Sequence, residues 1–564
     1  MKVFKISKTL NFQSNNIFSK LNKCSETSCF KNNLKNNLKN KYASVVSSNE
    51  HLFNKSVCYN NHKFSSRADK NQVAETASNE IKARVSECSE NFKNDAKNDA
   101  KNSVQNCAPN CAPNCAQNGA QNGAQNDAKQ SGDFEFSDNK QIELIANFMS
   151  KEKEKKMNRF YLDSQATTMI DPRVLDKMMP YMTYIYGNAH SRNHFFGWES
   201  EQAVEDARAN LIKLLNGNNN KEIIFTSGAT ESNNLALIGT CTYYNKLNNK
   251  KNHIITSQIE HKCILQTCRY LQTKGFEVTY LKPDANGLIK LEDLKNSIKE
   301  NTILASFIYV NNEIGVIQDI ENIGKICKEN KIIFHTDASQ AVGKIKIDVQ
   351  KLNIDLLSLS SHKLYGPKGV GALYIKRKKP NIRLNAIIHG GGQERGLRSG
   401  TLPTHLIVGL GEAANICLSE MDRDNKKMNF FFNYVKNYIS KELDYIIFNG
   451  CQINRYFGNM NISFLFVEGE SLLMSLNDIA LSSGSACTSS TLEPSYVLRS
   501  IGITEEIAHT SIRIGFNRFT TFFEVQQLCK NLVKSVKRLR SISPLYEAEL
   551  EKNTSGNYPK FIWT

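Results

Sequence analysis

Six polar side chains stand where apolar segments of the sequence end. They are Thr230, His261, Asn312, Asp337, Gln340 and Lys363. One such residue after a strand is usually a turn or cap residue, but six in corresponding positions are far less expected by chance. If the segments are parallel strands, these side chains meet at the carboxyl edge of one sheet, where α/β proteins bind ligands.

The residue types in this group suit pyridoxal phosphate. That cofactor requires a lysine for its Schiff base and a carboxylate opposite its pyridinium nitrogen, which keeps the ring an electron sink. Lys363 and Asp337 can supply these groups, because they follow two different apolar segments. The turn 227–231 joins a strand to a helix, and free N–H groups at a helix start bind phosphate. Alone, this turn is a weak signal, since many α/β crossovers look like it.

A second chemical feature is the thiol of Cys487, in a run of small, hydroxyl-rich residues between Leu481 and Pro494. Small side chains add little to a core, so the run indicates a solvent-reachable loop that presents a thiol. The alternative is a small buried cysteine in a turn. Taken alone, the loop favours this alternative, because a reactive cysteine needs surroundings that stabilise a thiolate.

Strands and helices that alternate along the chain must position these groups. Strands are predicted at 222–226, 253–256, 303–310, 331–335 and 356–359, and helices at 172–186 and 197–215. This alternation predicts an α/β fold whose large domain contains a mostly parallel, doubly wound sheet.

A smaller α/β domain is predicted from about Gly450. Its elements are a strand at 461–466, a helix from Gly469, a strand up to Leu481, a helix through Tyr496 and a long terminal helix. Before this domain, the loop 389–401 is rich in glycine and arginine. It lacks the G-K-[ST] ending of a nucleotide-binding loop, so we interpret it as a loop near a subunit boundary.

The first 50 residues have the character of a presequence. Nine lysines and one acidic residue, Glu26, occur among the first 49 residues, with short apolar groups between the lysines. This pattern is typical of an organellar presequence, although arginine is absent until Arg67. The alternative is a basic disordered tail.

Residues 51–157 form an Asn-rich extension that we expect to be disordered. A tetrapeptide repeat occupies 94–129, and its period of four suits neither a helix nor a strand. The repeat explains the spacing of Cys107, Cys111 and Cys115 more simply than a metal site does.

Composition excludes several classes of function. The formal charge is +17, but the residues up to Lys156 already hold 24 Lys and Arg against 16 Asp and Glu. The remaining charge forms no basic stripe, so no direct DNA binding is expected. Fifteen cysteines, an odd number without a C-x-x-C pair, indicate a reducing compartment. No run of about 18 apolar residues occurs, so no membrane span is expected.

From about residue 159 to 564 the sequence resembles the cysteine desulfurases of the class-V aminotransferase family, in their bacterial housekeeping and mitochondrial type. The matching segments include FTSGATES, IEHK, YVNNEIGVIQDI, HTDASQAVGK, SSHKLYGPKG, GGGQERGLRSGT and LSSGSACTSSTLEPSYVLR. The sequence departs from the usual pattern at Met169 and Ala189, where proline is common. It also departs at Ser361, where a glycine of the phosphate cup is common.

The resemblance implies the fold type I architecture of pyridoxal-phosphate-dependent transferases. The large cofactor-binding domain would span 158–420, with its N-terminal segment packed on the small domain. The small domain would span 421–564 and carry the cysteine loop (481–494) and a tail that docks a scaffold protein.

The resemblance also implies a role for each matching residue. Lys363 would bind the cofactor covalently, Asp337 would pair with its pyridinium nitrogen, and His261 would stack on its ring and shuttle protons. The other cofactor contacts would come from Ala229, Thr230, Asn312, Gln340, Ser360, His362 and, across a homodimer interface, Thr401. Arg513 and Asn312 would bind the substrate, and Cys487 would be the nucleophile.

The implied reaction removes sulfur from L-cysteine, giving L-alanine and a persulfide on Cys487. The sulfur would serve iron–sulfur cluster assembly and tRNA thiolation in the mitochondrial matrix. Implied partners are an iron–sulfur scaffold protein, a small accessory subunit of the mitochondrial complex, frataxin and acyl carrier protein. Cys487 would also be a transient iron–sulfur ligand shared with the scaffold.

Two alternatives stay open at this point. One is a related cofactor enzyme, a selenocysteine lyase or an aminotransferase, and an aminotransferase would not need Cys487. The other is a sulfur-relay or scaffold protein with a degenerate site, which the intact set of Lys363, Asp337, His261 and Cys487 argues against.

Overall fold

The structure, a computed structural model, describes residues 159–483 and 494–555. The predicted presequence, the repeat-bearing extension, Cys487 and the last nine residues lie outside the described residues. None of the described helices is both long enough and apolar enough to cross a membrane.

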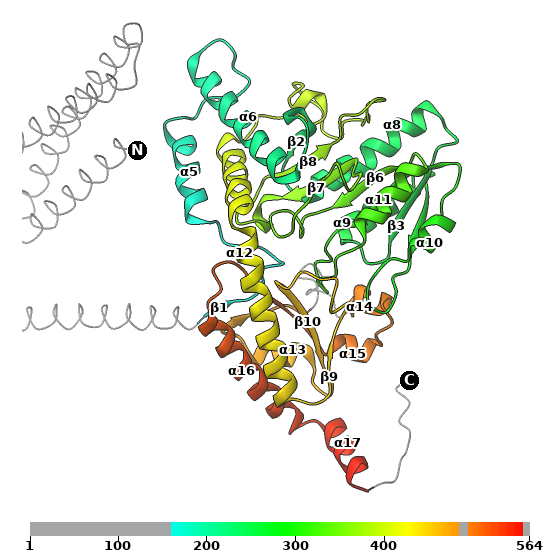
Figure 1. The fold of residues 1–564 in the computed structure, drawn as a ribbon, viewed down its shortest axis with the longest axis vertical. Coiled ribbons are helices and arrows are strands. Elements are labelled where there is room, and N and C mark those ends of the chain that lie inside the picture. Colours follow the sequence, from blue (N-terminus) through cyan, green and yellow to red (C-terminus); the bar gives the residue numbers. More distant parts are fainter. Residues whose placement is uncertain (1–158, 484–493, 556–564) are drawn as a thin grey trace, which may run out of the picture. The chain divides into compact units, whose positions relative to one another are not determined.

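A seven-stranded sheet forms the centre of the large domain (Figure 1). Its strands, in spatial order, are β2 (Ile223–Thr226), β8 (Gly371–Ile375), β7 (Leu356–Ser360), β6 (Ile333–Asp337), β5 (Thr302–Ile308), β3 (His253–Ser257) and β4 (Glu277–Leu281). Only β8 runs antiparallel to its neighbours. The predicted mostly parallel sheet is confirmed, and the carboxyl ends of β2, β3, β5, β6 and β7 therefore meet at one edge.

Helices cover both faces of this sheet. Successive residues of a strand point to opposite faces, and accordingly Ile224 and Phe225 of β2 belong to different apolar clusters. The helices are α5 (Pro172–Thr183), α6 (Phe195–Leu215), α7 (Ala229–Asn234), α8 (Thr240–Leu247), α9 (Lys262–Gln272), α10 (Leu291–Asn296) and α11 (Ile320–Glu329). Because α8, α9 and the π-helix η2 (Leu235–Gly239) pack in one cluster and α6, α10 and α11 in the other, the sheet is doubly wound.

One long helix, α12 (Thr404–Glu442), leads from the large domain to a second sheet. This antiparallel sheet has the order β12 (Ser511–Gly515), β10 (Asn459–Phe464) and β9 (Ile446–Phe448). Its helices are α13 (Gly469–Ser475), α14 (Tyr496–Ser500), α15 (Glu505–His509), α16 (Phe522–Arg540) and α17 (Pro544–Ser555). The position 420/421, at which the sequence analysis divides the two domains, falls within α12.

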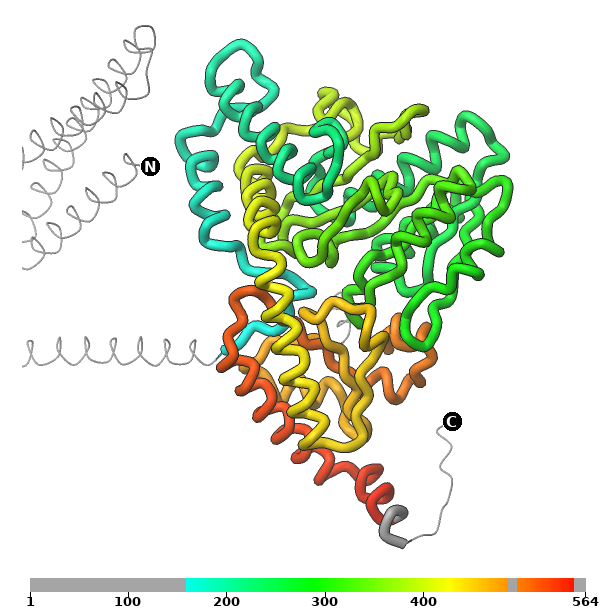
Figure 2. Tube along the Cα trace, viewed as in Figure 1, coloured from blue at the N-terminus to red at the C-terminus, as the bar shows by residue number. Residues whose placement is uncertain are grey.

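The first described residues lie against the C-terminal part of the chain (Figure 2). Strand β1 (Phe160–Tyr161) pairs in parallel with β11 (Ile479–Ala480), and the ring of Phe160 meets the ring of Phe523 edge-on, with centroids 6.0 Å apart. The chain then turns away into α5 and α6.

The prediction of a helix that runs through Tyr496 is wrong, because the helix α14 begins at Tyr496. The side chain of Ser495 caps this helix by accepting the backbone N–H of Leu498 at 3.2 Å. A serine cap after Pro494 marks a helix start, because proline disfavours helical geometry in the residue that precedes it.

Candidate functional site

A cavity of about 460 Å³ lies at the carboxyl edge of the large sheet. Ten of the residues predicted for the site line it: Ala229, Thr230, His261, Asn312, Asp337, Gln340, Ser360, His362, Lys363 and Arg513. The structure therefore brings together residues that follow five different strands, with an arginine from β12. Thr401 is exposed and does not line this cavity, and Cys487 lies outside the described residues.

Asp337 ends β6 with its side chain almost completely buried, at 3% exposure. Its Oδ2 accepts the side-chain amide of Asn233 at 2.8 Å, and its Oδ1 accepts both the backbone N–H of Ser339 at 3.0 Å and the Ser339 hydroxyl at 2.5 Å. Donors to an ionised carboxylate form strong, directional bonds, so the orientation of this carboxylate is fixed. Sequence reasoning missed Asn233 and Ser339, whose types carry no signal without the contact.

The amine of Lys363 lies just beyond the end of β7, in a 3₁₀ turn, η3 (Ser361–Lys363). It donates to the carbonyl oxygen of Ala166 at 2.9 Å and contacts the carbonyl oxygen of Gln165. The side-chain amide of Gln340 donates to that same Gln165 oxygen at 2.9 Å. The carbonyl oxygen of Gln165 is therefore contacted by both the Lys363 amine and the Gln340 amide.

A helix start and a neutral histidine also line the cavity. Gly371 of β8 packs so closely that a Cβ there would lie 2.7 Å from the Cα of Gly228, so glycine is required for the turn before α7. His362 shares a hydrogen bond of 3.0 Å between its Nδ1 and the Thr167 hydroxyl. Burial, with the nearby charge of Lys363, lowers the pKa of His362 to about 4, so the imidazole is neutral at pH 7.

His261 caps α9 with its own ring. Its Nδ1 accepts the backbone N–H of Cys263 at 3.1 Å and lies 3.0 Å from the Cys263 sulfur. Because Nδ1 accepts this bond, the neutral ring carries its proton on Nε2. Cys263 also lines the cavity, and sequence reasoning did not single it out.

Arg513 of β12 is the largest fully buried side chain around the cavity, at 1% exposure. It donates to the Asp163 carboxylate at 2.7 Å and to the carbonyl oxygen of Asn312 at 3.1 Å. Its Nε is buried without a hydrogen-bond partner among the described residues. An unpaired buried guanidinium N–H is costly, and because Arg513 lines the cavity, this donor is available to an anionic ligand bound there.

The loop 389–401 is tied to the large domain by two ion pairs. Arg208 and Glu394, both almost fully buried, form a bidentate pair, and Glu394 also accepts the backbone N–H of Phe225 at 2.7 Å. Arg398 pairs with Glu231, which lines the cavity. Breaking a buried pair such as the first typically costs about 3–5 kcal/mol.

The three departures from the family pattern leave the cavity lining unchanged. Met169 is exposed, and Ala189 is buried in the apolar core. The Oγ of Ser361 packs against Gly366, where an added Cβ would lie 2.1 Å from it. Ser361 does not line the cavity, so its hydroxyl takes the place of no ligand-facing atom.

Residues 160–528 match the family described as aminotransferase class-V. The cysteine desulfurase IscS of Plasmodium falciparum (isolate 3D7) is 84% identical over 424 residues, which cover 75% of this chain and 77% of that protein. The cysteine desulfurase IscS of Rickettsia rickettsii (strain Iowa) is 57% identical over 387 residues, covering 69% of this chain and 93% of that protein.

Solved structures agree with these relatives. A NifS-like protein has a TM-score of 0.62 at 36% identity, covering 67% of this chain and 99% of that one. A structure of SspA in complex with cysteine has a TM-score of 0.57 at 40% identity, covering 64% and 100%. The predicted family is confirmed: this chain belongs to the class-V aminotransferases and, within them, to the cysteine desulfurases.

Proposed function

We propose that this chain uses pyridoxal phosphate to remove sulfur from L-cysteine and release L-alanine. One observation carries the proposal: a single cavity unites Lys363, Asp337 and Arg513. The cofactor aldehyde requires a lysine amine, and the cofactor ring nitrogen requires a buried carboxylate. The carboxylate of an amino-acid substrate requires a donor such as a buried guanidinium N–H. The similarity to IscS supports cysteine as the amino acid.

The side chains of the cavity fit this cofactor. Lys363 would hold it covalently and Asp337 would accept the ring N–H, while His261 would stack on the ring. The phosphate would lie at the start of α7, held by Ala229, Thr230, Ser360 and His362, and the ring oxygen would meet Asn312 and Gln340. When bound, pyridoxal phosphate supplies an electron sink that makes bonds at the substrate Cα, and then the C–S bond, labile.

The chain's own residues would then bind the substrate and move its protons. Arg513 would hold the substrate carboxylate through its unpaired Nε. The amine of Lys363 would accept the proton from the substrate Cα. His261, with its Nδ1 occupied by a backbone N–H, would exchange protons through Nε2 alone. General acid–base help of this kind typically contributes about 10²–10⁴-fold.

Cys487 is the proposed nucleophile. Its thiolate would attack the substrate sulfur and form an S–S bond as the substrate C–S bond breaks. The electron pair of the broken bond stays with the carbon fragment, which is protonated and leaves as alanine, while the sulfur remains on Cys487 as a persulfide. Both flanks of segment 484–493 are tethered beside the cavity. Ser482 exchanges two backbone hydrogen bonds with Arg513, and the Ser495 hydroxyl donates to the carboxylate of Glu313, next to Asn312. These tethers support a cysteine within reach of the bound substrate.

The decisive experiment is mass spectrometry of the purified protein after addition of L-cysteine. We expect a sulfur adduct on Cys487 in the wild type and none in Cys487→Ser, which should keep the yellow colour of bound cofactor. Cys451→Ser, at a partly buried thiol outside the cavity, is the matched control and should leave the adduct intact. An adduct that persists on another cysteine in Cys487→Ser would refute the assignment.

The active form is proposed to be a homodimer in which Thr401 reaches the cofactor phosphate of the other subunit. Exposed apolar side chains on α5, on the first turn of α6 and between these helices support this: Met179, Met182, Tyr184, Tyr186, Phe195, Phe196 and Trp198. Exposed apolar surface of this kind marks protein interfaces.

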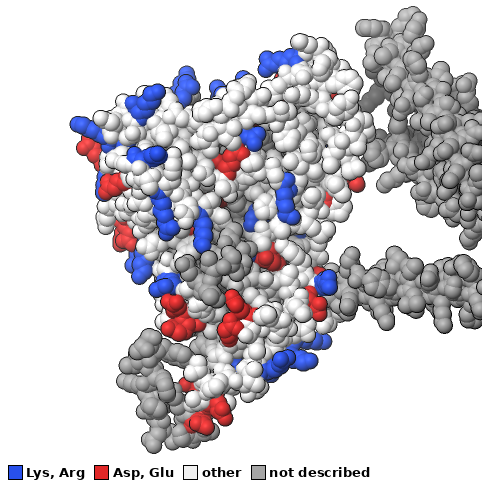
Figure 3. All heavy atoms as spheres, turned by 180° about the vertical axis from the view of Figure 1, so that it is seen from behind, with Lys and Arg blue, Asp and Glu red and all other residues white. Residues whose placement is uncertain are grey.

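We further propose the mitochondrial matrix as the location and iron–sulfur cluster assembly, with tRNA thiolation, as the destination of the sulfur. The lysine-rich first 50 residues support the location, and the usual role of IscS proteins supports the destination. The scaffold protein, the accessory subunit, frataxin and acyl carrier protein are the proposed partners, with Cys487 as a transient cluster ligand. Direct DNA binding is not proposed, since lysines and arginines on the face in Figure 3 are scattered among uncharged and acidic residues.

A further inference from the structure

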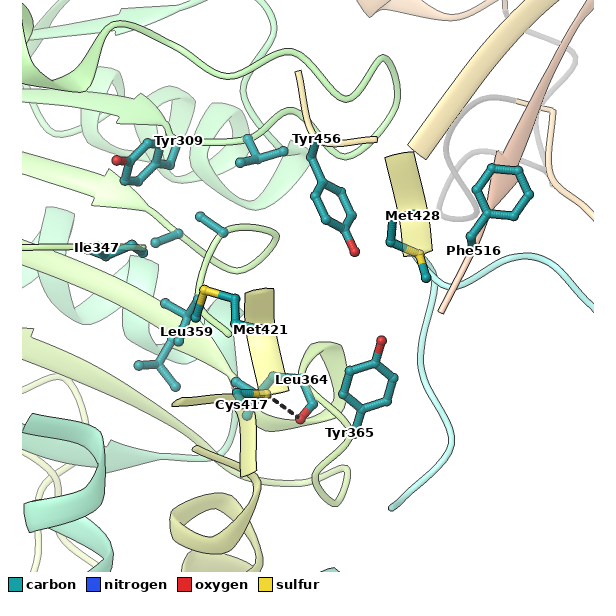
Figure 4. Close-up of a cluster of buried hydrophobic side chains, with 14 of the residues drawn as sticks. Tyr309, Ile347, Leu359, Leu364, Tyr365, Cys417, Met421, Met428, Tyr456 and Phe516 are labelled. Carbon is teal, nitrogen blue, oxygen red and sulfur yellow. Dashed lines mark hydrogen bonds between the residues drawn. The ribbon is translucent and has the colours of Figure 1, made fainter. Parts of the chain in front are cut away.

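A second lysine, Lys344, lies buried behind the cavity without lining it. Its side chain is 5% exposed, and its amine donates to the Oε1 atom of Gln340 at 2.6 Å. The amine also lies 5.4 Å from the ring centre of Tyr456. Figure 4 shows Tyr456 among buried side chains that include Met428 and Tyr365. The Lys344 side chain thus spans from an apolar cluster to a cavity residue.

Two neighbours fix which end of the Gln340 amide faces the cavity, the Lys344 amine and the backbone carbonyl of Gln165. A lysine ammonium has three donors and no acceptor, so the Gln340 atom that it contacts must be the oxygen. The amide nitrogen then points the other way, where it donates to the carbonyl oxygen of Gln165 at 2.9 Å. The Lys363 amine contacts that same carbonyl, so the amide N–H stands beside the cofactor lysine.

Burial makes this arrangement sensitive to charge. Burial, together with the positive charges of Lys363 and Arg513, lowers the pKa of Lys344 to about 7, while Cys417 acts in the opposite direction. A neutral amine can accept as well as donate, so it no longer dictates the amide orientation. The lysine backbone is held independently, because its carbonyl oxygen accepts the side-chain amide of Asn425 on α12 at 2.7 Å.

We propose that Lys344 is a positioning residue, which locks Gln340 with its amide N–H toward the cavity so that the cofactor ring oxygen meets a donor. The inference rests on the proposed function, in which Gln340 addresses that oxygen. A hydrogen-bond donor stabilises the negative charge of the ring oxygen. The oxygen then attracts less strongly the proton on the neighbouring nitrogen, which Lys363 contributes. That nitrogen then releases its proton more readily, which sets the pH at which the visible absorbance of the bound cofactor changes.

The test compares Lys344→Met, Gln340→Leu and the double variant. The readouts are the pH midpoint of the visible cofactor band and the dissociation constant of pyridoxal phosphate. Each single change should raise the midpoint by about 0.5–1 pH unit, as expected for loss of one hydrogen bond near a charge. The double variant should shift no further than Gln340→Leu alone, since both changes remove the same interaction.

Lys427→Met is the matched control. Lys427 is half-buried, donates to the carbonyl oxygen of Arg518 at 2.7 Å and lies 5.5 Å from the ring centre of Phe431, but it does not line the cavity. Its loss should lower the unfolding temperature and leave the midpoint unchanged. Lys344→Gln serves if Lys344→Met does not fold, because its amide can present either end to Gln340 and should shift the midpoint in the same direction.

Three outcomes would overturn the inference: an unchanged midpoint in Lys344→Met, an equal added shift in the Gln340→Leu background, or an equal shift in Lys427→Met. Failure of the proposed function is distinguishable, because the wild type would then show no visible band with pyridoxal phosphate. A Lys344 that only fills space would change stability without moving the midpoint.

Discussion

The two sides of the cavity are built in different ways. On the side of the large sheet, Asp337 is held by three donors from its own domain, and Lys363 and Gln340 converge on one carbonyl oxygen. On the side of β12, Arg513 has one N–H without a partner in the part of the chain that the structure describes. It takes its partners, Asp163 and Asn312, from distant parts of the chain. We call these two sides the cofactor side and the substrate side after their proposed roles. Asp337, Lys363 and Gln340 on the cofactor side are already hydrogen-bonded within the large domain, whereas Arg513 on the substrate side has one N–H without a partner among the described residues.

The largest effect is expected at the centre of the cofactor side. Lys363→Ala should abolish the visible cofactor band and lower alanine formation by about 10³-fold or more, within the range of a lost acid–base group. Absorbance spectra and an alanine assay measure both. Lys368→Ala, at an exposed lysine that lines the same cavity, is the control. A normal spectrum in Lys363→Ala would show that Lys363 does not hold the cofactor, and the assignment of the cofactor to this side of the cavity would then fail.

Arg513→Met should affect the substrate and spare the cofactor. Loss of a charged hydrogen bond to the substrate carboxylate corresponds to an increase of about 10–100-fold in KM for cysteine, with the visible band unchanged. Arg455→Met is a close control, because Arg455 is equally buried, also has an unpaired Nε and does not line the cavity. Loss of cofactor from Arg513→Met would contradict the division of roles.

Asn233→Leu tests whether the cofactor side is prearranged. This isosteric change removes one of the three donors to Asp337, and we expect the dissociation constant of pyridoxal phosphate to rise about 10-fold with little change in KM for cysteine. Fluorescence titration of the apoprotein measures the constant. Asn245→Leu, which removes a comparable hydrogen bond on α8, should leave it unchanged.

The smallest effect concerns a buried carboxyl behind the cofactor side. Burial raises the pKa of Glu260 to about 8 from its ordinary value of 4.5. Between these two values the folded protein holds a proton that the unfolded chain releases. The resulting contribution to the free energy of unfolding is complete below about pH 4.5 and is lost as pH rises through about 8.

Glu260→Gln should remove this pH dependence. Between pH 5 and 8, the slope of the free energy of unfolding against pH should become less steep by at most about 1.4 kcal/mol per pH unit, as measured by chemical unfolding. Glu329→Gln, at an exposed glutamate of α11, should leave the slope of the wild type. Equal slopes in all three proteins would show that Glu260 is ionised in the folded state.

The sequence analysis predicted that polar residues at the strand ends meet in one place, and they line the cavity, because they follow apolar segments whose period and length identify buried strands. It missed Asn233, Ser339 and Lys344, since these act through contacts with other side chains. The Asp163–Arg513 pair joins residues 350 positions apart, which no local pattern reveals. Strand β4 went unpredicted because, as an edge strand, it is mostly half-exposed and lacks a continuous apolar run.

Helix α12 connects these two sides of the molecule. It begins three residues after Thr401 and ends next to the small sheet that carries Arg513. Its 39 residues form a helix about 58 Å long. A tilt of only about 1° at one end displaces the other by ~1 Å over that length. A small tilt of this one helix would therefore change the distance between the loop that contains Thr401 and the sheet that carries Arg513.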